Sequence, residues 1–405
     1  MSENYTLTSL PSEITRILGD FSVHAHDATP EQKEAAAIIA GESREIKTRW
    51  NFTGMRFAVE ALSGGRNTVL IDDRGLPSIM VEIPAFCAKD VLPDAGDGLH
   101  PMFLAGGKSH KRIWISKYQN ITIDDHAYSL PGLDPRSGIS FDQAWQACKN
   151  KGCGWHLMSN AEWAGVALLS RANRSLPRGN TWFGGSHSHP HERGYVTFTY
   201  SGKDGTPDNG RVASGSGPVT WTHDGTIFGI YDLCGNLWEW LSGLRLQDGE
   251  IQIIPNNDAA LNPDHTSASS AWKSILPDGS LAIPGAKDTC HINGAASADE
   301  PPTIAKSIRC KSPEGRYNCV DFADLAFTAS EKIPDLLKLL CLAPSFCIPH
   351  EQGFFYANNT EERMAFRGGD WDGASRTGVF SLALMLQRNY TGYMGFRSAY
   401  IESEQ

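Results

Sequence analysis

The stretch Gly229-Ile-Tyr-Asp-Leu-Cys-Gly-Asn-Leu-Trp-Glu-Trp240 decides the fold. Gly235-Asn236 supplies a tight turn. The residues after that turn have the two-residue alternation of a β-strand, which places Trp238 and Trp240 on one face and Glu239 on the other. This pattern is typical of a scaffold strand that is entered through a fixed turn.

Four further motifs flank this strand in the chain. They are Ile139-Ser-Phe-Asp-Gln-Ala-Trp-Gln-Ala-Cys148, Trp155-His-Leu-Met-Ser-Asn-Ala-Glu-Trp163, Phe366-Arg-Gly-Gly-Asp-Trp371 and Gly395-Phe-Arg397. The first has apolar residues at helical spacing, and Ser159 with Glu162 in the second forms a capping box at the start of a helix. Two helices among short strands and long loops predict an α+β fold.

The order of these motifs resembles the C-type lectin fold of the formylglycine-generating-enzyme type, over roughly residues 80–400. The resemblance implies short strands, two core helices, long loops and an insert. Catalysis in that family rests on a cysteine pair near the C-terminus, and no cysteine lies between Phe366 and Gln405. Thiolate chemistry needs a thiol, so we expect no enzymatic activity and no cofactor.

The rest of the chain divides into two predicted units. Residues 1–75 form a small helical N-terminal unit, with helices predicted at 11–18 and 29–40, and residues 76–405 form the lectin-like domain. Two short strands are predicted around Asp73-Arg-Gly75. Residues 174–226 form a loop, and about 244–350 form an irregular insert with one helix near 329–341.

Composition excludes several classes of protein. The 405 residues carry 36 Lys and Arg against 46 Asp and Glu, a net charge of −10, so the chain lacks the basic excess that nucleic-acid binding requires. No apolar stretch is long enough to span a membrane, and the N-terminus has no Sec signal pattern. The 9 cysteines are an odd number in apolar settings, which indicates reduced, packed thiols.

Three local patterns have a structural interpretation as well as a functional one. The histidines of His187-Ser-His-Pro-His191 suit Zn²⁺ or Ni²⁺ but lie in a Gly/Ser loop without a neighbouring cluster of ligands, so we favour a solvated loop and predict no metal site. Asp72-Asp73 and Asp124-Asp125 stand beside turn signals and favour turn roles over acid–base catalysis. Gly106-Gly107-Lys108-Ser109 predicts a hairpin turn rather than a phosphate loop.

The segment from Arg367 to Tyr400 also resembles the variable region of proteins that diversity-generating retroelements diversify. Those systems rewrite template adenines, mostly in Asn codons. The resemblance implies that Trp371, Met385, Gln387 and Met394 are fixed or differently templated, because such codons do not yield them. It also implies that the residues between the fixed motifs contact a ligand.

The predicted ligand-binding residues are Asp370, Asp372, Gly373, Ser375, Arg376, Ala383, Leu386, Tyr390, Gly392 and Tyr393. Tyrosines offer large, rigid contact area at low entropic cost, as in antibody paratopes. The alternative interpretation is that these residues form an ordinary surface loop.

We therefore predict a non-catalytic receptor-binding protein that displays a hypervariable C-terminal segment of about 367–397. The expected partner is a protein or glycan on a target cell surface, with no nucleic acid and no membrane insertion. The expected location is a phage virion, in its tail, or the bacterial cytoplasm before assembly. The alternatives are an enzyme of the same fold, with metal at the three histidines, and a structural virion protein without a ligand.

Overall fold

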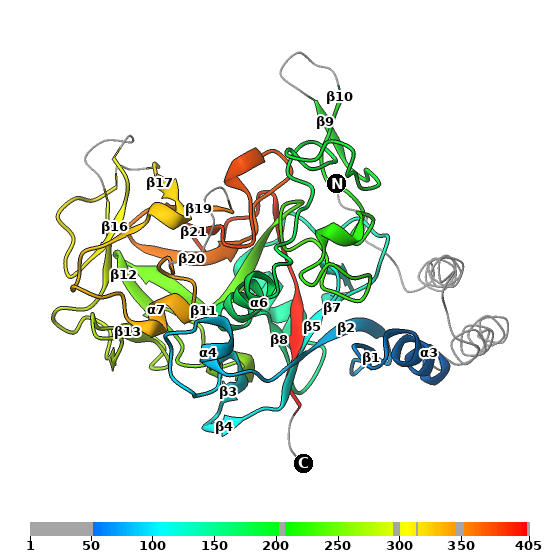
Figure 1. Ribbon diagram of the computed structural model, residues 1–405, viewed down its shortest axis with the longest axis horizontal. Coiled ribbons are helices and arrows are strands. Elements are labelled where there is room, and N and C mark those ends of the chain that lie inside the picture. The colour runs from blue at the N-terminus through cyan, green and yellow to red at the C-terminus, as the bar shows by residue number, and fades with distance from the viewer. Residues whose placement is uncertain (1–51, 202–206, 295–299, 313–314, 346–351, 403–405) are drawn as a thin grey trace.

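The computed structural model describes residues 52–201, 207–294, 300–312, 315–345 and 352–402 (Figure 1). The helices predicted at 11–18 and 29–40 lie outside these ranges. Within the described residues the α-helices are few. They are α3 (Thr53–Ser63), α4 (Ala88–Val91), α5 (Phe141–Lys149), α6 (Asn160–Ala172) and α7 (Asp335–Leu339).

The predicted helix starts are confirmed by their caps. Ser140 accepts a hydrogen bond from the backbone N–H of Gln143 at the start of α5. Ser159 and Glu162 form the predicted capping box of α6, which satisfies backbone N–H groups that have no partner within a helix. These local signals placed the two central helices correctly.

A five-stranded antiparallel sheet forms one half of the scaffold. Its order is β1 (Asn67–Ile71), β2 (Pro77–Pro84), β5 (Arg112–Ser116), β23 (Ser398–Tyr400) and β8 (Trp155–Leu157). The hairpin β1–β2 is the one predicted around Asp73-Arg-Gly75. The domain boundary predicted after residue 75 therefore falls in the turn of a hairpin whose second strand continues the sheet through β5.

A twelve-stranded sheet forms the other half of the described scaffold. Its main path runs β17 (Asn318–Asp321), β19 (Phe354–Ala357), β21 (Leu382–Leu386), β20 (Glu362–Arg367), β11 (Trp238–Gln247), β12 (Glu250–Ile253), β15 (His291–Asn293), β16 (Thr303–Ala305) and β18 (Ala326–Phe327). Off this path, β13 (Lys273–Ile275), β14 (Leu281–Ala282) and β22 (Met394–Phe396) pair with β12, β13 and β11.

The insert predicted at about 244–350 is therefore not irregular, because it supplies strands β12 to β18 to this sheet. These strands are only two to four residues long, too short for an alternating pattern to be recognised in the sequence. The helix predicted near 329–341 is shorter than expected. It begins after Pro334, because a proline disfavours helical backbone in the residue before it.

Three small hairpins complete the fold. They are β3 (Leu104–Ala105) with β4 (Lys108–Ser109), β6 (Ile121–Ile123) with β7 (His126–Tyr128), and β9 (Thr199–Ser201) with β10 (Pro207–Asn209). The first confirms the hairpin turn predicted at Gly106-Gly107. The third lies within the predicted loop 174–226.

Helix α6 joins the two sheets. Its buried Trp163 and Val166 belong to one apolar cluster with Ile113 and Ile115 of β5 and with Leu241 of β11. In Figure 1, α6 lies between these parts of the molecule. The architecture is mixed α+β with far more strand than helix, and β11 and β23 are interior strands of the two sheets.

Candidate functional site

The strand β11 confirms the predicted division of its two faces. Trp238 and Trp240 both pack against Phe366, with ring centroids 5.1 and 5.3 Å apart. Glu239, between them, is fully buried and accepts two hydrogen bonds of 2.6 Å from Arg397. Arg397 also donates to the backbone oxygen of Ser116. The C-terminal end of the segment 367–397 is therefore fixed in the protein core.

The other end of this segment is fixed in the same manner. Arg367 is fully buried and donates to the side-chain oxygen of Asn160 at 2.8 Å and to the backbone oxygen of Cys341 at 2.7 Å. Burial lowers the pKa of Arg367 to about 10. The left-handed Gly369 follows, with φ of 84°, and a side chain there would clash with Thr377.

Between these ends the chain reaches the surface at residues 372–376 and 385–393, whereas residues 377–384 are buried. Of the predicted ligand-binding residues, Asp372, Arg376, Tyr390 and Tyr393 are exposed. Five others are half-buried, namely Asp370, Gly373, Ser375, Leu386 and Gly392.

Ala383 is the exception among the predicted contact residues. It is fully buried in β21 and belongs to an apolar cluster with Trp240 and Phe366. In this structure its side chain does not reach the surface, so it is part of the scaffold and not of a contact surface.

A pocket of about 440 Å³ brings four of the predicted residues together. Asp370, Leu386, Tyr390 and Tyr393 line one part of it. The other lining residues are Trp238, Gly315, Arg316, Tyr317, Asn358, Arg363, Phe366, Met385 and Met394. A concave site with aromatic walls and a few charged groups is typical of ligand binding.

The pocket is open and aromatic. Tyr317, Tyr390 and Tyr393 are 46%, 43% and 51% exposed. Tyr393 packs edge-on against Trp371 at 4.8 Å, and Tyr317 packs against Tyr356 at 5.7 Å. Rings that are packed on one side and exposed on the other present rigid contact area to a partner.

Asp370 is the acidic group of the pocket wall. Burial, and then the negative charge of Asp372, raise the pKa of Asp370 to about 7. Within the described residues neither carboxylate takes part in an ion pair with a side chain. The protonated form of Asp370 is thus more favoured than that of an ordinary aspartate.

Sequence reasoning missed the residues that reach the pocket from outside segment 367–397. Arg316 and Tyr317 precede β17, which lies beside β19 in the sheet, and β19 lies beside β21. Only this strand pairing brings them to Tyr390 and Tyr393. The one signal in the sequence is an aromatic residue in an otherwise polar loop.

The thiols nearest the segment do not support nucleophilic chemistry. Cys341 lies behind Arg367 and is fully buried, and burial raises the pKa of its thiol to about 12. Burial likewise raises the pKa of Cys234 to about 12. Both thiols are protonated at neutral pH, whereas a nucleophilic cysteine needs a lowered pKa. The eight cysteines of the described residues are free thiols, and four of them are buried, whereas Cys153 is exposed and departs from the predicted packed setting.

Two of the three loop histidines form local hydrogen bonds. The Nδ1 of His187 lies 2.8 Å from the hydroxyl of Thr181, and the Nδ1 of His189 lies 3.0 Å from that of Ser188. Among the described residues, His, Cys, Asp and Glu side chains gather at metal-binding spacing around Asp72 and His126, not here.

That other group has its own role in the fold. One oxygen of Asp72 accepts hydrogen bonds from the backbone N–H groups of Arg74 and Leu76, which confirms the predicted turn role. The other oxygen of Asp72 accepts from the Tyr128 hydroxyl. Both oxygens of this carboxylate therefore take part in hydrogen bonds that shape the hairpin.

Comparisons with known proteins give distant similarities. The sequence matches no protein-family model and no curated protein. Among solved structures, PvdO from Pseudomonas aeruginosa aligns with a TM-score of 0.32 at 14% identity, over 83% of this chain and 98% of that one. The Major Tropism Determinant P3c and U1 variants align with TM-scores of 0.27 and 0.26 at 11% and 10% identity, each over 82% of this chain and 71% of theirs. TM-scores of this size do not establish a shared fold.

Proposed function

We propose that this chain is a non-catalytic receptor-binding protein with a C-type lectin fold of the formylglycine-generating-enzyme type. Its ligand-binding surface is the pocket of Tyr317, Tyr390, Tyr393 and Asp370. The observation that carries the proposal is the contrast within segment 367–397, whose two ends are fully buried while Asp370, Leu386, Tyr390 and Tyr393 between them line an open aromatic pocket.

The chemistry of the pocket favours recognition over catalysis. Its walls are aromatic and aliphatic, and its charges are of both signs, from Asp370, Arg316 and Arg363. No histidine or cysteine, the side chains that most often act as general base and nucleophile, lines the described pocket, and Asp370 is its one carboxylate. A protein or glycan on a cell surface is the proposed partner.

The proposed setting is a phage virion, with this chain at the tail. Among the described residues no helix has the length and apolar character needed to cross a membrane. Attachment to a particle would let a fixed scaffold present a changeable surface to the outside.

The binding proposal is tested with labelled protein on a panel of bacterial cells. We expect the wild-type chain to bind a subset of strains and the double variant Tyr390→Ala/Tyr393→Ala to lose at least tenfold in affinity, because buried tyrosines carry much of the binding energy of such interfaces. Tyr195→Ala is the matched control. Tyr195 is 74% exposed but does not line the pocket. Equal loss in both variants would overturn the assignment of the pocket.

We further propose that the exposed residues of segment 367–397 are diversified by a retroelement. The test is the DNA downstream of the gene. The proposal requires a near-copy of codons 367–397 that differs at adenines, followed by a reverse-transcriptase gene. If neither is present, the surface is not diversified in this way, and the binding proposal then rests on the cell panel alone.

A further inference from the structure

We propose that Arg388 and Glu362 form a clamp that fixes the Tyr390–Tyr393 loop of the pocket, and that the insert of about 244–350 braces this clamp. The inference rests on the proposed function, because it assigns positioning residues to that same site. It also gives the insert a role, which is to hold the base of the binding surface in place.

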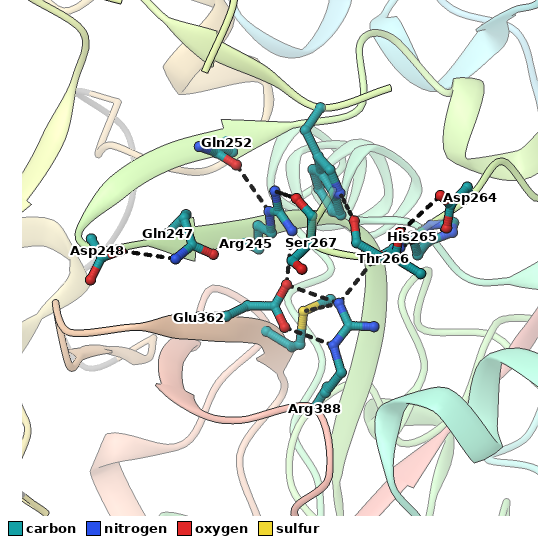
Figure 2. Close-up of polar contacts among 12 residues, drawn as sticks. Arg245, Gln247, Asp248, Gln252, Asp264, His265, Thr266, Ser267, Glu362 and Arg388 are labelled. Atoms are coloured by element: carbon teal, nitrogen blue, oxygen red, sulfur yellow. Dashed lines mark hydrogen bonds and ion pairs between the residues drawn. The ribbon is translucent and has the colours of Figure 1, made fainter. Parts of the chain in front are cut away.

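Arg388 lies two residues before Tyr390 and is held on several sides (Figure 2). Its Nε and Nη2 donate to the two carboxylate oxygens of Glu362 at 2.7 and 2.9 Å. Its Nη1 donates to Asp142 at 3.0 Å, and its Nη2 donates to the backbone oxygen of His265 at 2.8 Å. A planar guanidinium that bonds both oxygens of a carboxylate fixes direction as well as distance.

Glu362 is shared between two arginines. Arg245 donates to it from the other side at 2.8 Å. Burial alone would raise the pKa of Glu362, but the hydrogen bonds and charges of Arg388 and Arg245 lower it below the usual value. The carboxylate is therefore ionised at neutral pH and joins the two arginines into one network.

The network continues into the insert. Arg245 donates to the side-chain oxygen of Gln252 at 2.9 Å and to the backbone oxygen of Ser267 at 3.1 Å, and its guanidinium lies 4.3 Å from the ring centre of Trp272. Gln252 in turn donates to Glu250 at 2.6 Å, and Glu250 accepts from Thr289 at 2.7 Å. Figure 2 shows the contacts of Arg245 with Gln252 and Ser267.

A second chain of contacts holds the neighbouring residue. Gln387 donates to the carboxylate of Glu361 at 2.7 Å, and the backbone N–H of Glu361 donates to Asp248 at 3.1 Å. The backbone N–H of Tyr390 then donates to the backbone oxygen of Gln387 at 3.1 Å. Two consecutive residues at the base of the loop are thus tied to the β11–β12 turn and to β20.

Strand β20 connects the clamp to the pocket. Glu362 and Arg363 are adjacent in this strand, so their side chains point to opposite faces. Glu362 holds Arg388 on one face, while Arg363 lines the pocket on the other. Strand β20 therefore contributes to the clamp through Glu362 and to the pocket wall through Arg363.

The test is hydrogen–deuterium exchange of the full chain in four variants. Arg388→Ala removes the clamp. Glu362→Gln keeps the shape of the Glu362 side chain but removes its negative charge. Arg112→Ala is the matched control, because Arg112 also bonds two carboxylates, Glu82 and Glu402, but on the five-stranded sheet.

We expect the peptide containing residues 389–394 to exchange at least about tenfold faster in Arg388→Ala, and by a smaller factor in Glu362→Gln, with strands β5 and β8 unchanged. Arg388→Lys should fail to restore protection, because an ammonium does not reproduce the planar fork. Arg112→Ala should leave the loop unchanged. Unchanged exchange at 389–394 in Arg388→Ala, or equal acceleration throughout the chain, would overturn the proposal.

The binding proposal and the clamp fail in different experiments. If the wild-type chain binds no strain of the cell panel, the proposed function fails, while the exchange experiment still decides whether the clamp holds the loop. If cells bind but Arg388→Ala exchanges like the wild type, the binding surface stands and the clamp is wrong.

Discussion

The two ends of segment 367–397 and the middle of the segment both contain arginines, but the arginines at the ends are buried and Arg376 in the middle is exposed. Arg367 and Arg397 are fully buried, and their guanidinium groups meet oxygens of the core. Arg376, between them, is exposed, and so are Tyr390 and Tyr393. The ends specify where the chain runs, because a buried charge is tolerated only with its partners in place. The exposed residues of the middle need no buried partners, and this suits a surface that binds a ligand.

The largest expected effect is at the C-terminal end of the segment. Arg397→Met removes one member of a fully buried ion pair and leaves Glu239 without its partner. We expect the free energy of unfolding to fall by about 3–5 kcal/mol. Denaturant unfolding measures it, and the double variant Glu239→Leu/Arg397→Met should recover part of the loss. A cost below about 1 kcal/mol would show that the buried ends do not fix the segment.

Variants of Ala383 test whether burial or position in the segment decides how well a substitution is tolerated. Ala383→Tyr places a large side chain in a packed core, and we expect a loss of about 1–3 kcal/mol or more from overpacking. Leu386→Tyr, in the same strand, lines the open pocket and should cost less. Thermal unfolding of the two variants sharpens the comparison, and equal costs would contradict it.

The stability of the fold should depend on pH through Asp370. Because the pKa of Asp370 is raised in the folded state, the folded protein keeps a proton between about pH 4 and pH 7 that the unfolded protein releases. The free energy of unfolding therefore falls as the pH rises through this range. Asp370→Asn should therefore be more stable than the wild type, by on the order of 1–2 kcal/mol at pH 8, with the advantage shrinking toward pH 4. Unfolding curves at pH 4, 6 and 8 check the sign. A destabilised variant at pH 8 would mean that the ionised carboxylate stabilises the fold.

The smallest effect on stability is expected in the middle. Tyr390→Ala and Tyr393→Ala change exposed side chains, and we expect each to alter the free energy of unfolding by less than about 0.5–1 kcal/mol. Denaturant titration measures this beside the binding assay. A large loss of stability would show that the tyrosines are structural and would remove the contrast with Arg397.

Much of the scaffold could be predicted from the sequence because its signals are local. The capping box of Ser159 and Glu162, the hairpin at Asp73-Arg-Gly75 and the alternation at Trp238-Glu-Trp240 all depend on neighbouring residues. The fold as a lectin-like domain and the predicted N-terminal helices remain predictions, since the helices fall outside the described residues.

The rest depends on contacts between distant residues. Ala383 was predicted to contact ligand, yet Leu382, Ala383 and Leu384 are all buried. A strand covered on both faces gives no alternating pattern to separate inside from outside. Tyr317 reaches the pocket only through the pairing of β17 with β19, and the clamp of Arg388 spans residues that lie far apart in the chain.

The most direct test of the central claim is a mutational scan of residues 367–397 with two readouts, resistance to protease and binding to the cell panel. We predict two classes of position. Substitutions at Arg367, Ala383 and Arg397 should lose folding and binding together, whereas substitutions at Tyr390 and Tyr393 should keep folding and lose binding. If the exposed positions lose neither, the pocket is not the binding surface. If they lose folding as readily as the buried ends, the contrast between ends and middle is wrong.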